Sequence, residues 1–301
     1  MADPKISVVL STLGNHDVLR RVLDGYDAQA TNAFELLVVA DREEPDLDAV
    51  TRAIGDRRYP IRLLQGEVPG LSANRNAGWQ AARAPLLLFT DNDTIPVPTL
   101  ISEHLEWHRR FPADEVAVVG LVRWALGIKV TPFMRWLEHG VQFDYESISG
   151  EDASWAHLYG ANSSIKRALL ERVGGYDEER LPYGYEDLDW GYRAREYGLR
   201  VKLNRRAIVD HWREMTVENW QVRAPRLAQS ERRFCELHPE IAPWFHDKFA
   251  PAAKLTAGGR RSAALARFVP RQTPLLGKLV WERADLYWRQ QIAPYFLAAW
   301  E

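Results

Sequence analysis

Two carboxylates and an amide stand where the sequence could do chemistry on phosphates. Asp91, Asn92 and Asp93 directly follow the apolar run 85–90. Such a run predicts a strand buried on both faces, and ligands of open α/β sheets bind beyond the carboxyl ends of the strands. Carboxylates there suit a hard divalent cation, Mn²⁺ or Mg²⁺, that bridges the phosphates of a nucleotide. The alternative is an acidic turn that merely closes the strand.

A second acidic group lies later in the chain. Glu186, Asp187 and Asp189 crowd the predicted start of a helix. The helix dipole alone can account for carboxylates at that position. Several carboxylates beside a metal site would also provide a general base for a sugar hydroxyl. His211 ends a later strand, where it is either a structural hydrogen-bonding residue or a metal ligand beside Asp93.

Three further polar residues are placed to meet a ligand. Asp41 follows the second apolar run and could accept hydrogen bonds from a base. Asn74 and Arg75 open a predicted helix, whose N-terminus favours an anion. A turn-forming aspartate and a solvated arginine are the ordinary explanations. Their convergence at strand ends favours a shared site.

The elements that must position these residues alternate along the chain. Apolar runs at 6–12, 36–40, 61–64 and 85–90 predict strands, and the segments between them predict helices, with Asn15 and Ser72 as N-caps. Such alternation predicts an α/β fold with a mostly parallel sheet flanked by helices. Strands at 116–124 and 201–212 and helices at 167–173 and 188–197 follow, and from 216 onward we expect helices.

Composition excludes several classes of protein. The net charge is −2 without blocks of like charge, so no nucleic-acid surface is expected, and a single cysteine, Cys235, excludes a disulfide framework. No P-loop or G-x-G-x-x-G motif is present. The N-terminus lacks signal-peptide features and no apolar run reaches membrane-spanning length, so we expect a cytoplasmic protein, at most peripheral at the inner face of the membrane.

Five motifs occur in the order seen in family 2 glycosyltransferases of the GT-A fold: Asp41, 74–78, 91–93, 174–177 and Glu186-Asp187. The chain resembles that family over residues 5–215. Residues 174–193 also resemble the C-terminal motif of β-1,4-galactosyltransferases and polypeptide GalNAc-transferases. The resemblance implies a GT-A domain at 1–215, with a nucleotide-sugar half at 1–125 and an acceptor half at 126–215, and a helical C-terminal extension at 216–301.

The resemblance also implies roles for individual residues. Asp187 matches the catalytic base of an inverting transfer, with Glu186 beside it, and Asp93 and His211 match metal ligands. The donor, a UDP-sugar, would be bound by Thr12, Asp41, Asn74, Arg75, Asp91 and Asn92. Two departures stand out, because residue 42 is arginine where many members carry a second aspartate, and the processive Q-x-x-R-W signature is missing.

The sequence also bears on two alternative functions, a sugar nucleotidyltransferase and a non-catalytic binding protein, and on the acceptor. A sugar nucleotidyltransferase needs a glycine-rich loop after Thr12, which is absent, and a non-catalytic binding protein would tolerate loss of Asp93 or Asp187, which are both retained. Trp155 and Trp190 are predicted to contact the acceptor, although core packing explains them equally well. The acceptor itself, a saccharide, a lipid-linked sugar or a small molecule, stays open. For the aromatic tail 275–300 we favour self-packing or homodimerisation over membrane association.

Overall fold

The structure, a computed structural model, describes residues 3–301 and contains two compact units. The first comprises the chain up to Ile128 together with Tyr145–Arg213, and the second comprises Lys129–Asp144 and Glu214–Glu301. The division into domains at residues 1–215 and 216–301 remains a prediction, and each unit is described by itself.

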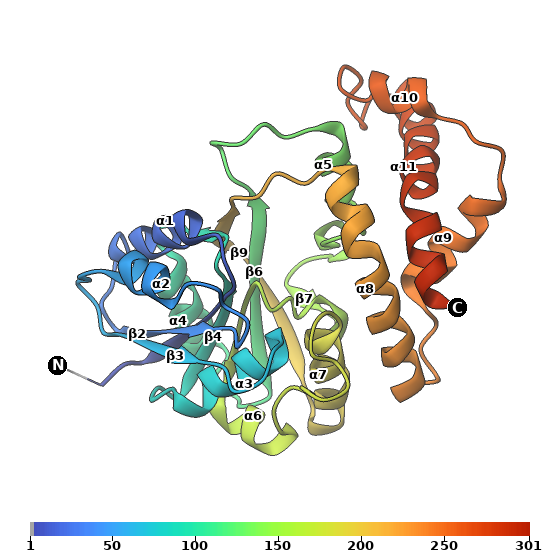
Figure 1. The fold of residues 1–301 in the computed structure, drawn as a ribbon. Helices are drawn as coiled ribbons and strands as arrows, with labels where there is room; N and C mark the ends of the chain where they lie inside the picture. The colour runs from blue at the N-terminus through green and yellow to red at the C-terminus, as the bar shows by residue number, and fades with distance from the viewer. Residues whose placement is uncertain (1–2) are drawn as a thin grey trace. The chain divides into compact units, whose positions relative to one another are not determined.

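One sheet forms the centre of the first unit (Figure 1). Among the described residues it has nine strands, in the order β3-β2-β1-β4-β8-β6-β9-β5, with β7 paired to β9. The strands are β1 (Ile6–Thr12), β2 (Phe34–Ala40), β3 (Ile61–Gln65), β4 (Leu86–Asp91), β5 (Thr94–Pro96), β6 (Val116–Trp124), β7 (Asp152–Ala153), β8 (Asn162–Lys166) and β9 (Arg200–His211). Strands β1 to β4 are mutually parallel, whereas β8 runs antiparallel to both β4 and β6.

Helices connect the parallel strands and cover the sheet. They are α1 (His16–Asp27), α2 (Leu47–Ile54), α3 (Leu71–Ala81), α4 (Leu100–Arg110), α6 (Arg167–Val173) and α7 (Glu186–Ala194), with short 3₁₀ turns η1 (Tyr145–Ser147), η2 (Trp155–His157) and η3 (Arg195–Tyr197). The predicted α/β sheet flanked by helices is therefore confirmed.

The two predicted N-caps differ from expectation. Helix α3 begins at Leu71 with Gly70 as its N-cap, and the hydroxyl of Ser72 donates instead to the carbonyl of Leu181. Asn15 does occupy the N-cap position of α1, but its backbone is left-handed and its side chain makes no capping hydrogen bond. A cap read from residue type alone ignores such tertiary partners.

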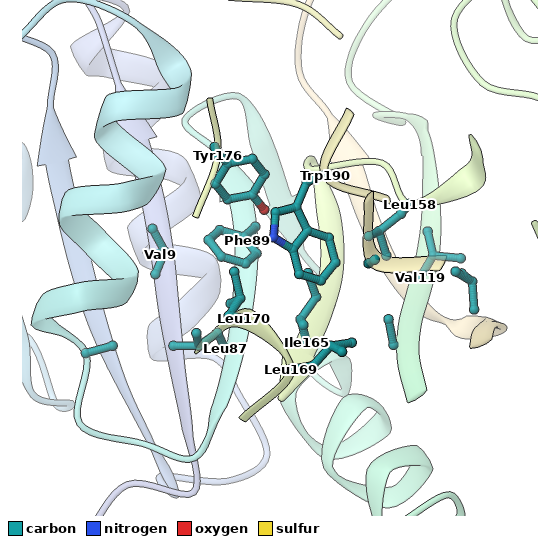
Figure 2. Packing of buried hydrophobic residues seen from close by; sticks show 14 of the residues in the cluster. Val9, Leu87, Phe89, Val119, Leu158, Ile165, Leu169, Leu170, Tyr176 and Trp190 are labelled. Atoms are coloured by element: carbon teal, nitrogen blue, oxygen red, sulfur yellow. The ribbon is translucent and has the colours of Figure 1, made fainter. Parts of the chain in front are cut away.

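The core beneath α3, α6 and α7 fixes the position of the acidic helix start. Alternate residues of the parallel strands, such as Val9, Leu37 and Phe89, point to this face, as the two-residue period of a strand requires. Figure 2 shows Trp190 of α7 packed among Phe89, Tyr176 and neighbouring aliphatic side chains. Burial of this indole anchors the first turn of α7.

The second unit is helical, as predicted for residues after 216. Its helices are α5 (Pro132–Leu137), α8 (Val217–Leu237), α9 (Trp244–Lys254), α10 (Arg260–Leu265) and α11 (Leu276–Trp300). Aromatic contacts such as Phe249–Phe296 and Trp136–Trp288 pack α11 against its neighbours in this unit. Across residues 3–301, no helix combines the length and the apolar character needed to cross a membrane.

Candidate active site

The carboxyl ends of three parallel strands meet at one edge of the sheet. Thr12 is paired with Ala40 at the end of β2, and Ser11 is paired with Asp91 at the end of β4. Asp41 follows β2 directly, and its N–H donates to the carbonyl of Thr12 at 2.9 Å. Parallel pairing in this register therefore places Thr12, Asp41 and Asp91 along the same edge, as the sequence predicts.

Strand β9 brings His211 to Asp93. Strands β5 and β9 are antiparallel with Thr94 opposite His211, and the N–H of Trp212 donates to the carbonyl of Asp93 at 2.7 Å. The His211 Nε2 lies 3.4 Å from Asp93 Oδ2. Arg213 Nη1 lies 3.5 Å from the same oxygen. The structure thus joins the two predicted metal ligands, which are both buried.

Local charges keep Asp93 ionised. Burial by itself would raise the pKa of its carboxyl, but the neighbouring His211 and Arg213 outweigh that cost, and the pKa lies below its ordinary value. An ionised carboxylate beside an imidazole suits Mn²⁺ or Mg²⁺ as a partial set of ligands. The Nδ1 of His211 is buried and has no hydrogen-bond partner in the described structure. Within residues 3–301, no group of three or more His, Cys, Asp or Glu side chains could hold a metal ion, so other ligands would have to complete the coordination.

Arg75 links the two acidic groups of the site. Its guanidinium is buried, with Nη1 2.5 Å from Glu186 Oε1 and Nη2 3.7 Å from Asp91 Oδ1. Tyr176 lies below it, with the guanidinium carbon 5.6 Å from the ring centroid. Arg75 was expected to approach the nucleotide, whereas here it joins β4 to the start of α7.

The electrostatics of this cluster are those of a crowded acidic site. Burial raises the pKa of Asp91, because the attraction of Arg75 does not fully compensate and Asp93 and Asp187 add repulsion. Burial likewise raises the pKa of Glu186 despite its ion pair with Arg75. Burial opposes the charge of Arg75, but Glu186 and Asp91 more than offset it and raise the pKa of the guanidinium. A cationic ligand or metal would therefore relieve repulsion among these carboxylates.

Asp187 is held at the first turn of α7 by backbone donors. Its Oδ2 accepts the N–H of Gly160 at 2.9 Å and its Oδ1 accepts the N–H of Leu188 at 2.9 Å. The side chain is only half-buried. The preceding residue but one, Tyr185, has a left-handed backbone with φ of 65°, an unusual conformation for a non-glycine residue that turns the chain into α7. These features orient the Asp187 carboxylate while leaving it accessible.

The remaining residues that were predicted to bind the nucleotide sugar make hydrogen bonds that hold loops in place. Asp41 accepts hydrogen bonds from Gly70 N–H at 2.9 Å and from Asn74 Nδ2 at 2.8 Å through one oxygen, and from Glu43 N–H at 2.9 Å through the other. Asn92 Nδ2 donates to Thr12 Oγ1 at 2.9 Å. Most acceptor capacity of Asp41 is therefore used within the protein.

The two tryptophans expected at the acceptor differ sharply. Trp190 is 0% exposed and its Nε1 donates to the carbonyl of Gly174 at 2.8 Å, so its ring offers no surface to an acceptor (Figure 2). Core packing, the alternative weighed from the sequence, describes its position. Trp155 is partly exposed, and its ring meets Tyr192 edge to face with 5.0 Å between centroids.

Comparison with known proteins identifies the family. Residues 4–232, most of the chain, match the family described as "Glycosyltransferase like family 2". The chain belongs to this family of glycosyltransferases. The resemblance of residues 174–193 to galactosyltransferases stays a prediction.

Several relatives of this family 2 glycosyltransferase chain are similar over much of its length. A validoxylamine A glucosyltransferase of Streptomyces hygroscopicus subsp. limoneus is 26% identical over 283 residues, covering 80% of this chain. The chain spans only 58% of the length of that relative.

Two solved structures share the fold, which confirms the GT-A prediction. One is a mannosyltransferase from Pyrobaculum calidifontis in complex with GDP-Man and Mn²⁺, with a TM-score of 0.64, 18% identity and coverage of 99% of this chain and 86% of the other. The other is S. aureus TarS 1-349 in complex with UDP-GlcNAc, with a TM-score of 0.55, 14% identity and coverage of 98% and 92%.

Two residues of the site were not anticipated from the sequence of this family 2 chain. An added Cβ at Gly160 would lie 2.1 Å from Arg75 Nη2, so the absence of a side chain there makes room for the buried guanidinium. Arg213 approaches Asp93 from beyond β9. A glycine two residues before β8 was the available signal for the first, and a basic residue two positions after His211 was the signal for the second.

Proposed function

We propose that this chain is an inverting, metal-dependent glycosyltransferase that moves a sugar from a UDP-sugar to an acceptor hydroxyl. One observation carries the proposal: Arg75 joins Asp91, which lies two residues from Asp93, to Glu186, which lies next to Asp187. A candidate general base and a candidate diphosphate site thus belong to one cluster. The proposal includes the prediction that residues 174–193, which contain Asp187, correspond to the C-terminal motif of β-1,4-galactosyltransferases.

In the proposed reaction Asp187 removes the proton of the acceptor hydroxyl. The hydroxyl oxygen forms a bond to the anomeric carbon, while the bond from that carbon to the diphosphate oxygen breaks and the nucleoside diphosphate leaves with the electron pair. A single displacement of this kind inverts the anomeric configuration. The N–H groups of Gly160 and Leu188 aim the Asp187 carboxylate. Positioning of the base in this way contributes directly to the rate.

Asp93 and His211 would hold the divalent cation, Mn²⁺ or Mg²⁺. When bound, such a cation neutralises the negative charge that develops on the leaving diphosphate. Arg213 lies beside Asp93 with its side chain 55% exposed. Its guanidinium is therefore free to turn toward a phosphate, to which arginine binds well.

We assign the donor to the edge formed by Thr12, Asp41, Asn74, Asp91 and Asn92. Asp41 Oδ1 accepts one protein N–H and has capacity for a base N–H. Arg75 contributes indirectly, because its guanidinium holds the Asp91 and Glu186 carboxylates in place. The two structural neighbours contain GDP-Man and UDP-GlcNAc, which supports a nucleoside diphosphate sugar as the donor class.

The acceptor is proposed only by class: a saccharide, a lipid-linked sugar or a small molecule. The validoxylamine A relative supports the small-molecule class by its name. Trp155 is the aromatic side chain that we assign to the acceptor, because its ring remains partly exposed next to α7.

Slow donor hydrolysis tests the proposal without knowledge of the acceptor. The chain is incubated with a panel of nucleotide sugars and Mn²⁺, and the products are separated by ion-exchange chromatography. Release of a nucleoside diphosphate together with free sugar supports a glycosyltransferase. Formation of a nucleoside triphosphate when pyrophosphate is added would instead identify a nucleotidyltransferase, and a protein inert to every donor would support the non-catalytic binding protein.

A further inference from the structure

The second unit carries a concentration of exposed apolar side chains. Residues Leu255, Leu265, Phe268, Leu275, Leu276 and Leu279 are all solvent-exposed, with Leu275 at 89% and Phe268 at 71%. Exposed apolar residues scattered singly need no explanation, but a cluster of large ones marks an interaction surface.

The fold of this unit brings Phe268 close to Leu275 and Leu276. Helix α10 and the loop after it pack against the first half of α11 (Figure 1). Trp281 Nε1 of α11 donates to the carbonyl of Val269 at 2.8 Å. Gly277 touches the backbone of Pro270 and Arg271, at 2.8 and 2.5 Å from an added Cβ. Phe268 therefore lies on the same part of the unit as Leu275 and Leu276.

The same segment is strongly basic. Residues 255–283 contain six basic side chains and one acidic one, in a chain whose net charge is −2. All six are exposed. Among the residues that the structure describes, Arg260, Arg261, Arg267, Arg271 and Arg283 have no carboxylate within 4.0 Å. Arginines of the first unit, by contrast, commonly form ion pairs, as Arg57 and Arg193 do. The Arg267 guanidinium stacks on the ring of Phe268, with 4.6 Å to the ring centroid. The surface therefore carries net positive charge that no carboxylate of residues 3–301 neutralises locally, and it can attract an anionic partner.

The positive charge of this surface helps to choose between three possible partners: a second copy of the chain, a nucleic acid and an anionic bilayer. A symmetric dimer through this surface would set the same arginines against each other, which is repulsive. Other apolar side chains of α11 are already used inside this unit, since Trp288, Ile292 and Phe296 are buried. Leucines offer no stacking face for nucleic-acid bases. An anionic bilayer satisfies both features, because leucine side chains enter the acyl region and arginines reach the lipid phosphates.

We propose that a basic apolar patch docks the chain on the surface of an anionic phospholipid bilayer. The patch consists of the exposed leucines and Phe268 within residues 265–279, together with Arg260, Arg261, Arg267, Arg271 and Arg283. The interaction is peripheral, and it does not depend on the function proposed above. Attraction of the arginines to acidic headgroups and burial of the apolar side chains contribute together.

Sedimentation with vesicles tests the proposal on the full chain. We expect the protein to pellet with vesicles of phosphatidylglycerol and phosphatidylcholine, to remain in solution with phosphatidylcholine alone, and to dissociate as the salt concentration rises. Replacement of Phe268, Leu275 and Leu276 by serine should weaken partitioning by ~10-fold or more. Arg267→Gln with Arg271→Gln should weaken it most at low salt.

Val222→Ser is the matched control, because Val222 is 83% exposed in the same unit but lies outside the patch. Since every substituted side chain is exposed, all variants should retain the melting temperature of the parent. The proposal is overturned if the parent protein does not pellet with anionic vesicles, or if the triple serine variant pellets to the same extent as the parent. It is also overturned if light scattering finds a dimer that the triple serine variant converts to a monomer, because the patch would then be a subunit interface.

Discussion

At the scale of single residues, the question is which carboxylate of the α7 turn can take a proton. Glu186 is paired with Arg75, and Asp189 is paired with Arg193 at 2.8 Å. Among residues 3–301, the hydrogen-bond donors to the Asp187 carboxylate are backbone N–H groups, and the side chain is half-buried. A carboxylate that is oriented but not neutralised by a cation is the best placed to act as a base.

Asp187→Asn should therefore lower turnover by ~10²–10⁴-fold while leaving donor affinity unchanged, because the amide keeps the shape but cannot accept the proton. Single-turnover kinetics give the rate, and calorimetry with the nucleoside diphosphate gives the affinity. Glu186→Gln is the companion variant. If Asp187→Asn retains turnover and Glu186→Gln abolishes it, the base is Glu186.

Asp93 belongs to the same scale but to a different role. Asp93→Ala should abolish the Mn²⁺-dependent part of UDP binding, because the carboxylate that would hold the cation is gone. Calorimetry with UDP in the presence and absence of Mn²⁺ measures this part directly. Unchanged affinities in both conditions would remove Asp93 from the metal site. Asp41→Ala should instead lower UDP affinity whether or not Mn²⁺ is present.

At the scale of elements, the sequence predicts local structure well and long-range contacts poorly. The bounds of α6 and β6 agree with the predicted ones at both ends, because apolar periodicity and β-branched content are local signals. The antiparallel insertion of β8 between β4 and β6 was not predicted, because strand order depends on tertiary packing. The pairing of Arg75 with Glu186 has the same origin, since it joins α3 to α7.

Gly160 shows how an element boundary controls the site. Its N–H holds Asp187, and its lack of a side chain accommodates Arg75. Gly160→Ala should displace the guanidinium, misalign Asp187 and reduce the rate of transfer by ~10-fold or more, since small displacements of catalytic groups are costly. Gly258→Ala is the matched control, because the nearest atom to its added Cβ lies at 3.7 Å. Equal rates for both variants would show that the contact between Gly160 and Arg75 does not control positioning.

At the scale of the whole molecule, the proposed chemistry and the C-terminal helices belong to different units. The predicted site lies in the first unit, and an aromatic helical core fills the second. The sequence of α11 could not tell a core helix from an interface helix, because leucine, tryptophan and arginine are interleaved along it. In the structure one set of its apolar side chains is buried, among them Trp281, Ile292 and Phe296, and another is exposed, namely Leu276, Leu279 and Tyr295.

Helix α11 should therefore contribute to stability through its buried side chains and not through its exposed ones. Ile292 is 0% exposed, whereas Leu279 on the same helix is 49% exposed. Ile292→Ala should lower the free energy of unfolding by ~2–5 kcal/mol through lost burial and a cavity, and Leu279→Ala should change it by less than ~0.5 kcal/mol. Urea titration followed by circular dichroism measures both.

Truncation after Arg271 removes all of α11 and extends the same argument. Its loss uncovers the aromatic rings of Phe249 and Trp136, so we expect an unstable chain that aggregates in size-exclusion chromatography. A truncated chain that stays folded and monodisperse, together with equal stability of the two alanine variants, would mean that α11 is not part of the core of its unit. Its apolar residues would then be free to serve an interface along the whole helix.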